Sequence, residues 1–350
     1  MKVSTLSTAV SGIVGITMAY QGFGVWSLVA QSLGKNLLQT SLLWLFHDWR
    51  PACLFSLSSL RSMFPYGSKL FFSNLLNIIF GNLNAIVIGK IFPAAALGFY
   101  SRAKFLQEIP VSSTSDVAAR VMFPIFCSIQ NDKDRLTQAM RQALTMLAML
   151  SFPLMIGLAV IAKPLVLVLL TEKWLPCVPY LQLFCAIGAL YPLQLINLNV
   201  LKAQGRSDLF LKAEIIKKIM TVIALVITYR WGIIAMISGE IVASFLSYYI
   251  NCVYLNRVLN YSMITQIKEV LPSLLLASVM GGGVYALNYV SFPNQFTLLA
   301  TQVILGGALY SVLCYIFKLS PFLKSMEICR QRFPMISKTI IKNAPPRPTN

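Results

Sequence analysis

The sequence predicts an all-α fold, a polytopic transmembrane helix bundle, and three observations support this class. The chain of 350 residues is 57% hydrophobic and only 11% charged, about half the charged share of a typical globular protein. Its apolar windows are about 20 residues long, which suits a hydrocarbon core about 30 Å thick. These runs are continuous and do not alternate in ten-residue segments, so helices are favoured over a membrane barrel.

Ten spans are predicted, separated by turn-forming stretches such as QNDKDR at 130–135. The spans cover 4–20, 25–46, 66–90, 97–128, 138–162, 178–202, 212–230, 232–256, 269–290 and 294–318. Of the 29 Lys and Arg residues, eighteen lie on the side that holds both termini and six on the opposite side. The positive-inside rule therefore places both termini in the cytoplasm. Because topology explains most of the net charge of +18, no nucleic-acid partner is expected.

Metal and cofactor chemistry is not expected. The seven cysteines are scattered without a CxxC pair, and His47 is the sole histidine, so a zinc or redox site is disfavoured. The GGG at 281–283 lies inside a span and not in a strand–helix turn, which excludes a phosphate loop there. Without paired catalytic carboxylates or a nucleophile motif, the chain is predicted not to be an enzyme.

The stretch VSSTSDVAARV at 111–121 places polar and charged residues inside the fourth predicted span. An ionisable side chain within a bilayer costs about 2.5–3.5 kcal/mol, so it usually faces a partner or a water-filled cavity. Asp116 and Arg120 are four residues apart, on one helix face, where they can pair. Two interpretations remain open: a salt bridge that packs helices, or one wall of an aqueous cavity.

A polar stripe follows the third predicted span. Ser73, Asn77, Gly81 and Asn84 recur at spacings of four, four and three residues, and Lys69 lies one turn before Ser73. Such a stripe lines either a helix–helix seam or an aqueous path. Because the neighbouring span is also polar on one face, a cavity shared by the two spans is favoured.

Further charges lie in the seventh and eighth predicted spans. Glu214 and Lys218 have the favourable i, i+4 order, and Lys217 lies beside them. These three residues either extend to the headgroups or face the bundle interior. Glu240 has no basic residue within one turn and is the best candidate for a protonatable carboxylate.

Several motifs occur together along the chain. They are GFGVWSLV (22–29), WRP (49–51), FPYGSKLFFSNLLN (64–77), IVIGKIFPAAALGFYSRA (86–103), VMFPIFCSIQNDKDRL (121–136), EKWLPCVPYLQ (172–182) and NVLKAQGRSDLFLKAEIIKK (199–218). In this order the set resembles the Wzx-type polysaccharide flippases, in the branch that includes O-antigen, colanic acid and teichuronic acid exporters. This family belongs to the superfamily of multidrug, oligosaccharidyl-lipid and polysaccharide exporters.

The resemblance implies a function. Members move undecaprenyl-diphosphate-linked oligosaccharide units across the bacterial inner membrane for lipopolysaccharide O-antigen, exopolysaccharide or capsule. The implied partners are the lipid-linked substrate, the bilayer, and polysaccharide polymerase and chain-length proteins. Lys69, Arg102, Arg120 and Lys217 would receive the diphosphate or acidic sugars, and Glu240 or Asp116 would couple transport to an ion.

The resemblance also implies a domain organisation. Residues 1–46 would be the last two helices of an amino-terminal lobe and 47–65 a cytoplasmic linker. Residues 66–258 would form the carboxy-terminal six-helix lobe, 264–319 an extra helix pair and 320–350 a basic cytoplasmic tail. Aligned on the motifs, the chain starts at the fifth helix of the family, so the first four are expected to be missing.

Four other classes remain under consideration. The chain is a non-functional remnant if the missing helices are essential, and a lipid II flippase would fit the motifs less well. A drug/cation antiporter of the same superfamily would favour acidic groups, whereas these spans carry more Lys and Arg. A membrane polymerase or ligase would need a large outer loop, and the longest outward connection, 163–177, is short.

Overall fold

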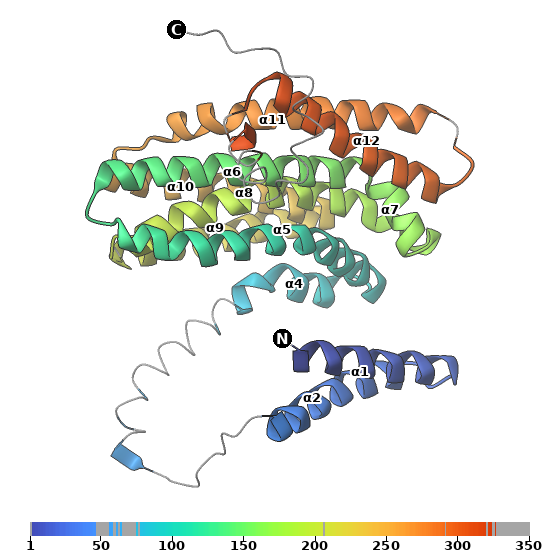
Figure 1. Cartoon of the computed structure of the whole chain (residues 1–350). Helices are drawn as coiled ribbons and strands as arrows, with labels where there is room; N and C mark the ends of the chain where they lie inside the picture. The colour runs from blue at the N-terminus through green and yellow to red at the C-terminus, as the bar shows by residue number, and fades with distance from the viewer. Residues whose placement is uncertain are drawn as a thin grey trace. The chain divides into compact units, whose positions relative to one another are not determined.

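The structure is a computed structural model of the chain. It describes residues 2–46, 56–58, 61, 64, 75, 78–205, 207–290, 292–319, 321–323 and 326, without the side chains of 2, 116–119, 207 and 208. The chain divides into two compact units, Met1–Leu75 and Leu76–Asn350, which are considered separately (Figure 1).

The described part of the first unit contains an antiparallel helix pair, α1 (Lys2–Tyr20) and α2 (Trp26–Phe46). The turn between them needs two residues with positive φ, which Gly22 and Gly24 supply at 85° and 52°. Glycine adopts this conformation without the steric cost that a side chain would add. The chain can therefore reverse within five residues.

Small residues bring the two helices of this pair close together. Ser7, Ser11 and Gly15 repeat every four residues on α1, and both serines are buried. A Cβ at Gly15 would lie 2.9 Å from Cβ of Gln31 on α2. Small residues at this spacing let helix backbones approach within a membrane, where apolar burial alone cannot hold helices together.

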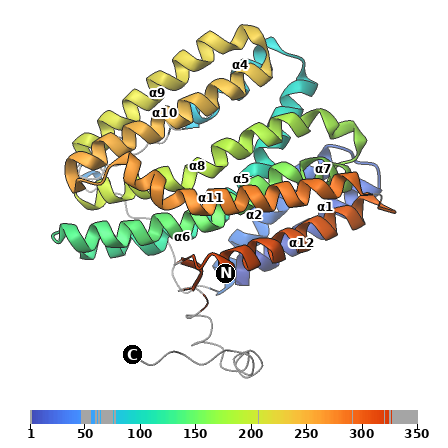
Figure 2. The ribbon, with the colours of Figure 1, turned by 90° about the horizontal axis from the view of Figure 1, so that it is seen from above.

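The second unit is a helical bundle. Its labelled helices are α4 (Leu83–Ile91), α5 (Ala94–Ser128), α6 (Lys133–Val160), α7 (Ala162–Leu169), α8 (Val178–Ala203), α9 (Ser207–Thr228), α10 (Ile233–Leu259), α11 (Met263–Ala286) and α12 (Gln295–Ile316). Short 3-10 helices η1 (Glu172–Cys177), η2 (Tyr229–Trp231) and η3 (Leu287–Tyr289) join some of them. Helix α8 is central and packs on α5, α6 and α10, while α9 packs on α10 and α11 on α6 (Figure 2).

The prediction of an all-helical chain is confirmed across the described residues, and nine of the ten predicted spans coincide with a helix or most of one. The stretch 111–121 is not a loop, because it lies inside the continuous 35-residue helix α5. Most of the third predicted span, 66–90, lies outside the described residues. Six described helical segments are long and apolar enough to cross a membrane, and the count of ten spans remains a prediction.

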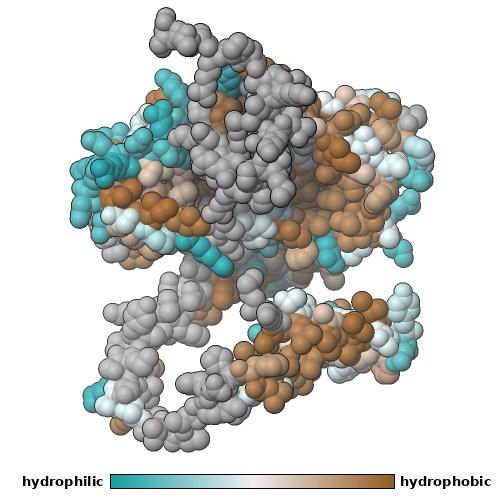
Figure 3. Space-filling model, viewed as in Figure 1, coloured by the Kyte–Doolittle hydropathy of each residue, from teal (hydrophilic) through white to brown (hydrophobic). Residues whose placement is uncertain are grey.

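The surface of the second unit is apolar where a soluble protein would be charged. Ile304 on α12, Val226 on α9 and Val279 on α11 are 70%, 61% and 57% exposed. Figure 3 shows hydrophobic residues over much of the visible face and hydrophilic residues concentrated toward the end where α5 joins α6. A belt of this kind is stable only against lipid or another apolar surface.

The interior, by contrast, holds polar side chains that bond across helices. The Oε1 atom of Gln266 on α11 accepts hydrogen bonds from Nδ2 of Asn197 on α8 at 3.2 Å and from the hydroxyl of Tyr248 on α10 at 3.1 Å. Gln266 and Asn197 are fully buried. Because a buried amide without partners is costly, this group fixes three helices to one another.

Two apolar clusters fill the described core, and both include α8. One takes residues from the first half of α8, such as Leu181 and Phe184, with Tyr100 of α5. The other takes the second half of α8, such as Leu193 and Leu201.

Neighbouring glycines on α11 give a test of how tightly α6 and α11 pack. A Cβ at Gly281 would lie 2.5 Å from Cγ2 of Ile156, whereas a Cβ at Gly282 meets nothing within 4 Å. We expect Gly281→Ala to destabilise the protein by about 1–3 kcal/mol through overpacking. Gly282→Ala should be neutral or slightly stabilising because alanine favours the helix. Thermal unfolding of the purified variants in detergent checks this, and equal midpoints would contradict the close approach.

Candidate functional site

A polar cavity of about 560 Å³ lies between α5, α8 and α10. Its polar lining consists of Lys104, Gln107, Glu108, Ser112, Tyr191 and Glu240, and its apolar lining includes Phe105, Phe184 and Ile187. Lys104, Gln107, Glu108 and Ser112 share one face of α5 because they are three or four residues apart. The cavity therefore collects its polar groups mainly from one stripe of one helix.

The cavity borders the first of the two apolar clusters. On α8 its lining runs from Phe184, a member of that cluster, to Tyr191, two residues before Leu193 of the second cluster. On α10 it reaches Glu240, within the helix Ile233–Leu259. This places it within the membrane-spanning length of these helices, the depth at which transporters typically bind their substrates.

Glu240 is held in place from another helix. Nδ2 of Asn84 on α4 donates a hydrogen bond to Oε2 of Glu240 at 2.8 Å, and Asn84 is 8% exposed. An amide donor can accompany either protonation state of a carboxyl group, since it contributes no charge of its own. The structure thus brings together two residues of the predicted site, one from the polar stripe and one proposed for ion coupling.

Lys104 is the cation of this cavity in the described part of the chain. Its Nζ donates to the carbonyl oxygen of Gly81, just before α4, at 3.1 Å. An ammonium group has three donors, so this contact leaves capacity for an anionic group in the cavity. In the topology prediction Lys104 is one of the six Lys and Arg residues on the side opposite the termini, and it was not proposed as a site residue. The structure shows that it lines the cavity.

Gln107 approaches the cavity where α8 has no side chain. A Cβ at Gly188 would lie 2.3 Å from Nε2 of Gln107 and 2.6 Å from Sδ of Met155. Gln107 is 6% exposed. Because residue 188 is glycine, the side-chain amide of Gln107 can lie between α5 and α8 without a steric clash.

Arg102, predicted as an anion-binding group, is not among the residues that line the cavity. Its guanidinium carbon is 5.4 Å from the ring centroid of Trp174 and 5.8 Å from that of Phe105. These are cation–π distances. The role of Arg102 toward a substrate remains a prediction, and its described contacts are with aromatic rings.

The charges on α9 pair differently from the predicted arrangement. Glu214 forms its ion pair with Lys217, three residues on, and not with Lys218. Lys218 instead lies 5.5 Å from the ring centroid of Phe80. Residues three apart on a helix can pair as readily as residues four apart, so Glu214 can reach Lys217. The aromatic partner of Lys218, Phe80, comes from another segment and could not be predicted from the sequence of α9.

Several predicted site residues cannot be placed. Lys69, Ser73 and Asn77 lie outside the described residues, as does the side chain of Asp116. Arg120 is exposed on α5. The predicted Asp116–Arg120 pair therefore remains a prediction.

Lys104, Gln107 and Glu108 were missed as site residues. The signal was present, because these residues and Ser112 repeat at spacings of three, one and four in the stretch KFLQEIPVS. All four residues lie inside the fourth predicted span, 97–128, but Lys104 was counted only toward the topology. In the structure they lie on α5, Ala94–Ser128, and line a cavity together with residues of α8 and α10.

The fold and the polar cavity among apolar helices define a multi-pass helical membrane protein. The solved structure of the lipid II flippase MurJ in its inward closed conformation superimposes with a TM-score of 0.69, covering 90% of this chain and 67% of that one at 17% identity. At this identity the likeness establishes the shared fold. A family model described as polysaccharide biosynthesis protein matches residues 1–179, and the chain belongs to this family.

Curated relatives agree with this assignment. Teichuronic acid biosynthesis protein TuaB of Bacillus subtilis is 27% identical over 86% of this chain and 63% of its own length. Lipopolysaccharide biosynthesis protein WzxC of Escherichia coli is 26% identical over 88% of this chain and 61% of its own. Succinoglycan biosynthesis transport protein ExoT of Rhizobium meliloti is 24% identical over 95% of this chain and 68% of its own. The resemblance predicted from the motifs is confirmed, and the chain spans about three fifths of the first two relatives.

The contact between Asn84 and Glu240 can be measured by a double-mutant cycle. We expect the effects of Asn84→Leu and Glu240→Leu on the free energy of unfolding to depart from additivity by about 1–2 kcal/mol. A hydrogen bond to a charged group is worth more than the average side-chain hydrogen bond in a membrane protein. The readout is the thermal unfolding midpoint in detergent. As a control, Asn84→Leu combined with Ser278→Ala on α11 should be additive, since distant sites do not couple. Additivity of the first pair would show that the hydrogen bond contributes nothing.

Proposed function

We propose that the chain forms part of the path by which a lipid-linked oligosaccharide crosses the bacterial inner membrane from the cytoplasmic to the outer leaflet. The substrate class is an undecaprenyl-diphosphate-linked unit for surface polysaccharide. The observation that carries the proposal is the polar cavity around Lys104, enclosed by helices whose outer faces are apolar. The family and the transport named for ExoT support it.

The chemistry of the cavity suits the polar part of such a substrate. Lys104 supplies a donor for a phosphate or an acidic sugar, and Gln107 and Ser112 supply hydrogen-bonding groups for hydroxyls. Phe184 and Phe105 give apolar faces of the kind that pack against sugar rings. The lipid part would remain beside the apolar outer faces of the helices.

The carboxylates of the cavity support coupling to a cation. Glu108 and Glu240 line it together with Lys104, so the described charges are two negative and one positive. A site of this kind can take up a proton or Na⁺ when the cavity faces one side and release it on the other. Glu240, held by Asn84, is the residue proposed to do so.

The same charge balance is the observation that favours a second candidate, a drug/cation antiporter. The sequence alone disfavours this class, because the spans hold more Lys and Arg than carboxylate. The described cavity shows the reverse ratio. A substitution in the cavity separates these two functions, because it should lower surface polysaccharide in a flippase and change susceptibility to cationic drugs in an antiporter.

The proposal also includes the partners of the pathway. A flipped unit has to be consumed on the outer side, so we propose that a polysaccharide polymerase and chain-length proteins act next. This role requires no covalent chemistry from the chain itself, in keeping with relatives that are described as a transport protein and a flippase.

The experiment is a chromosomal Lys104→Gln substitution in the cell that encodes the protein. We expect surface polysaccharide to fall about tenfold or more, because the cavity loses a charge-assisted contact with its anionic substrate. The lipid-linked unit should accumulate where a membrane-impermeant oxidant applied to spheroplasts cannot reach it. Electrophoresis of the polysaccharide and mass spectrometry of the lipid extract provide the readout.

Lys163→Gln is the matched control, because this exposed lysine at the start of α7 does not line the cavity. It should leave polysaccharide unchanged. If Lys104→Gln alters susceptibility to cationic drugs and not polysaccharide, the antiporter is the better function. If the accumulated unit is accessible to the oxidant, the block lies after flipping, as in a polymerase, and the proposal fails.

A further inference from the structure

A second polar cavity, of about 590 Å³, lies between the beginnings of α6 and α11. Its basic groups are Arg141 and Lys268, and Gln138, Gln142 and Thr145 add hydrogen-bonding side chains. It is separate from the cavity around Lys104, with which it shares no lining residue. Nothing in the proposed transport path uses it.

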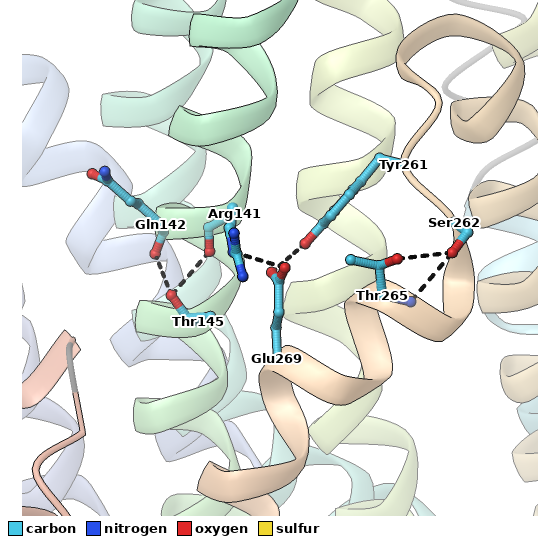
Figure 4. Close-up of polar contacts among 7 residues, drawn as sticks. All are labelled: Arg141, Gln142, Thr145, Tyr261, Ser262, Thr265 and Glu269. Atoms are coloured by element: carbon cyan, nitrogen blue, oxygen red, sulfur yellow. Dashed lines mark hydrogen bonds and ion pairs between the residues drawn. The ribbon is translucent and has the colours of Figure 1, made fainter.

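One acidic residue forms the inner wall of this second cavity. Oε1 of Glu269 pairs with Nε of Arg141 at 2.7 Å, and the Glu269 side chain is only 8% exposed while that of Arg141 is 62% exposed. The hydroxyl of Tyr261 donates to Oε2 of Glu269 (Figure 4). Burial and this carboxylate raise the pKa of Tyr261, so the phenol keeps its proton at neutral pH. Both oxygens of Glu269 are thus engaged, and Arg141 is anchored through one of its nitrogens.

The rest of the Arg141 guanidinium remains available. A guanidinium has five N–H donors, and the described contact to Glu269 uses Nε. Lys268 is exposed and forms no described ion pair. With Glu269 counted, the three charged residues sum to +1, which matches the single negative charge of a phosphodiester better than the larger charge of a diphosphate.

An apolar cavity of about 640 Å³ follows the charged one along α6. It is lined by Met149, Leu150, Pro153 and Leu154 of α6, by Met280 of α11, and by Val303 of α12. The lining of the charged cavity ends at Met146 on α6, one turn before. From Arg141 to Leu158, at the far part of the apolar cavity, α6 extends about 25 Å, longer than half of a hydrocarbon core about 30 Å thick.

We infer that this groove between α6 and α11 binds a monoanionic glycerophospholipid of the membrane, with its phosphodiester between Arg141 and Lys268 and an acyl chain along Met149–Leu158. The occupant is a resident lipid and not the transported unit. Basic pockets next to apolar helix grooves at one membrane surface have the chemistry that recognises anionic headgroups. The inference therefore stands independently of what the polar cavity around Lys104 transports.

The basic tail of this chain is a less suitable occupant. Pro321 and Phe322 at its start line the two cavities. From residue 323 to the end the tail carries six Lys and Arg residues and one Glu, so its charge repels Arg141 and Lys268. A free phosphate ion would match the headgroup pocket but not the apolar cavity beyond it. A phospholipid matches both.

Native mass spectrometry of the full chain purified in detergent tests this inference. Phosphatidylglycerol and phosphatidylcholine are titrated separately. We expect phosphatidylglycerol to bind at least about fivefold more tightly, because one basic contact with an anionic headgroup changes the affinity by about that factor. Lys268→Gln should lower phosphatidylglycerol binding about fivefold, and Lys268→Glu should lower it further. Because Lys268 is exposed and forms no ion pair in the described structure, these variants leave the Arg141–Glu269 ion pair intact.

Arg135→Gln is the matched control, since Arg135 lies on the same helix near the same surface but outside the cavity, paired with Asp132. It should leave phosphatidylglycerol binding unchanged. Equal affinity for both lipids, or an equal loss with Arg135→Gln and Lys268→Gln, would overturn the site. Release of the bound lipid by millimolar inorganic phosphate would show an ion site and would also overturn it.

Discussion

The absence of water from the hydrocarbon core is the constraint on which this structure depends. Backbone donors and acceptors there must find partners within the protein, which accounts for the helical form of the described spans. The same constraint sends polar side chains inward, where Gln266, Asn197 and Tyr248 join three helices through one amide oxygen. Apolar side chains can then cover the outside, as Ile304 and Val279 do. The arrangement is the reverse of a soluble bundle.

The free-energy cost of charge within a bilayer explains why the three charged residues of the polar cavity lie together. Lys104, Glu108 and Glu240 would each be costly in isolation within the spans, yet they line one space and lie near one another's opposite charge. The carbonyl of Gly81 and the amide of Asn84 give two of them fixed positions. A cavity whose charges are held but not fully paired can exchange its internal partners for a substrate group or an ion.

The sequence predicted the helices well because each span is long and its hydropathy is averaged over many residues. The turn at Asp132 and the polar stretch inside α5 were both assigned correctly. The site was harder, because it depends on which helices meet. Lys104 lies inside the predicted span as well as inside α5, but the sequence of one helix does not show that its side chain faces α8 and α10 across a cavity. Likewise, no pattern in α9 alone could show that Phe80 would approach Lys218. Glu240 and Asn84 were found because an isolated carboxylate and a polar stripe are visible without packing.

The amide of Gln266 also has a mechanical consequence. It lies at the beginning of α11, and its bonds reach α8 and α10, while Glu269 one turn later is paired with α6. Three helices of the bundle therefore hold the first turns of α11 through buried polar bonds. Any rearrangement that opens or closes the cavity has to carry this end of α11 along as part of one rigid block with α6, α8 and α10. Bending is left to segments without such bonds, which directs the search for moving parts toward α5, with its two internal prolines, and toward α9.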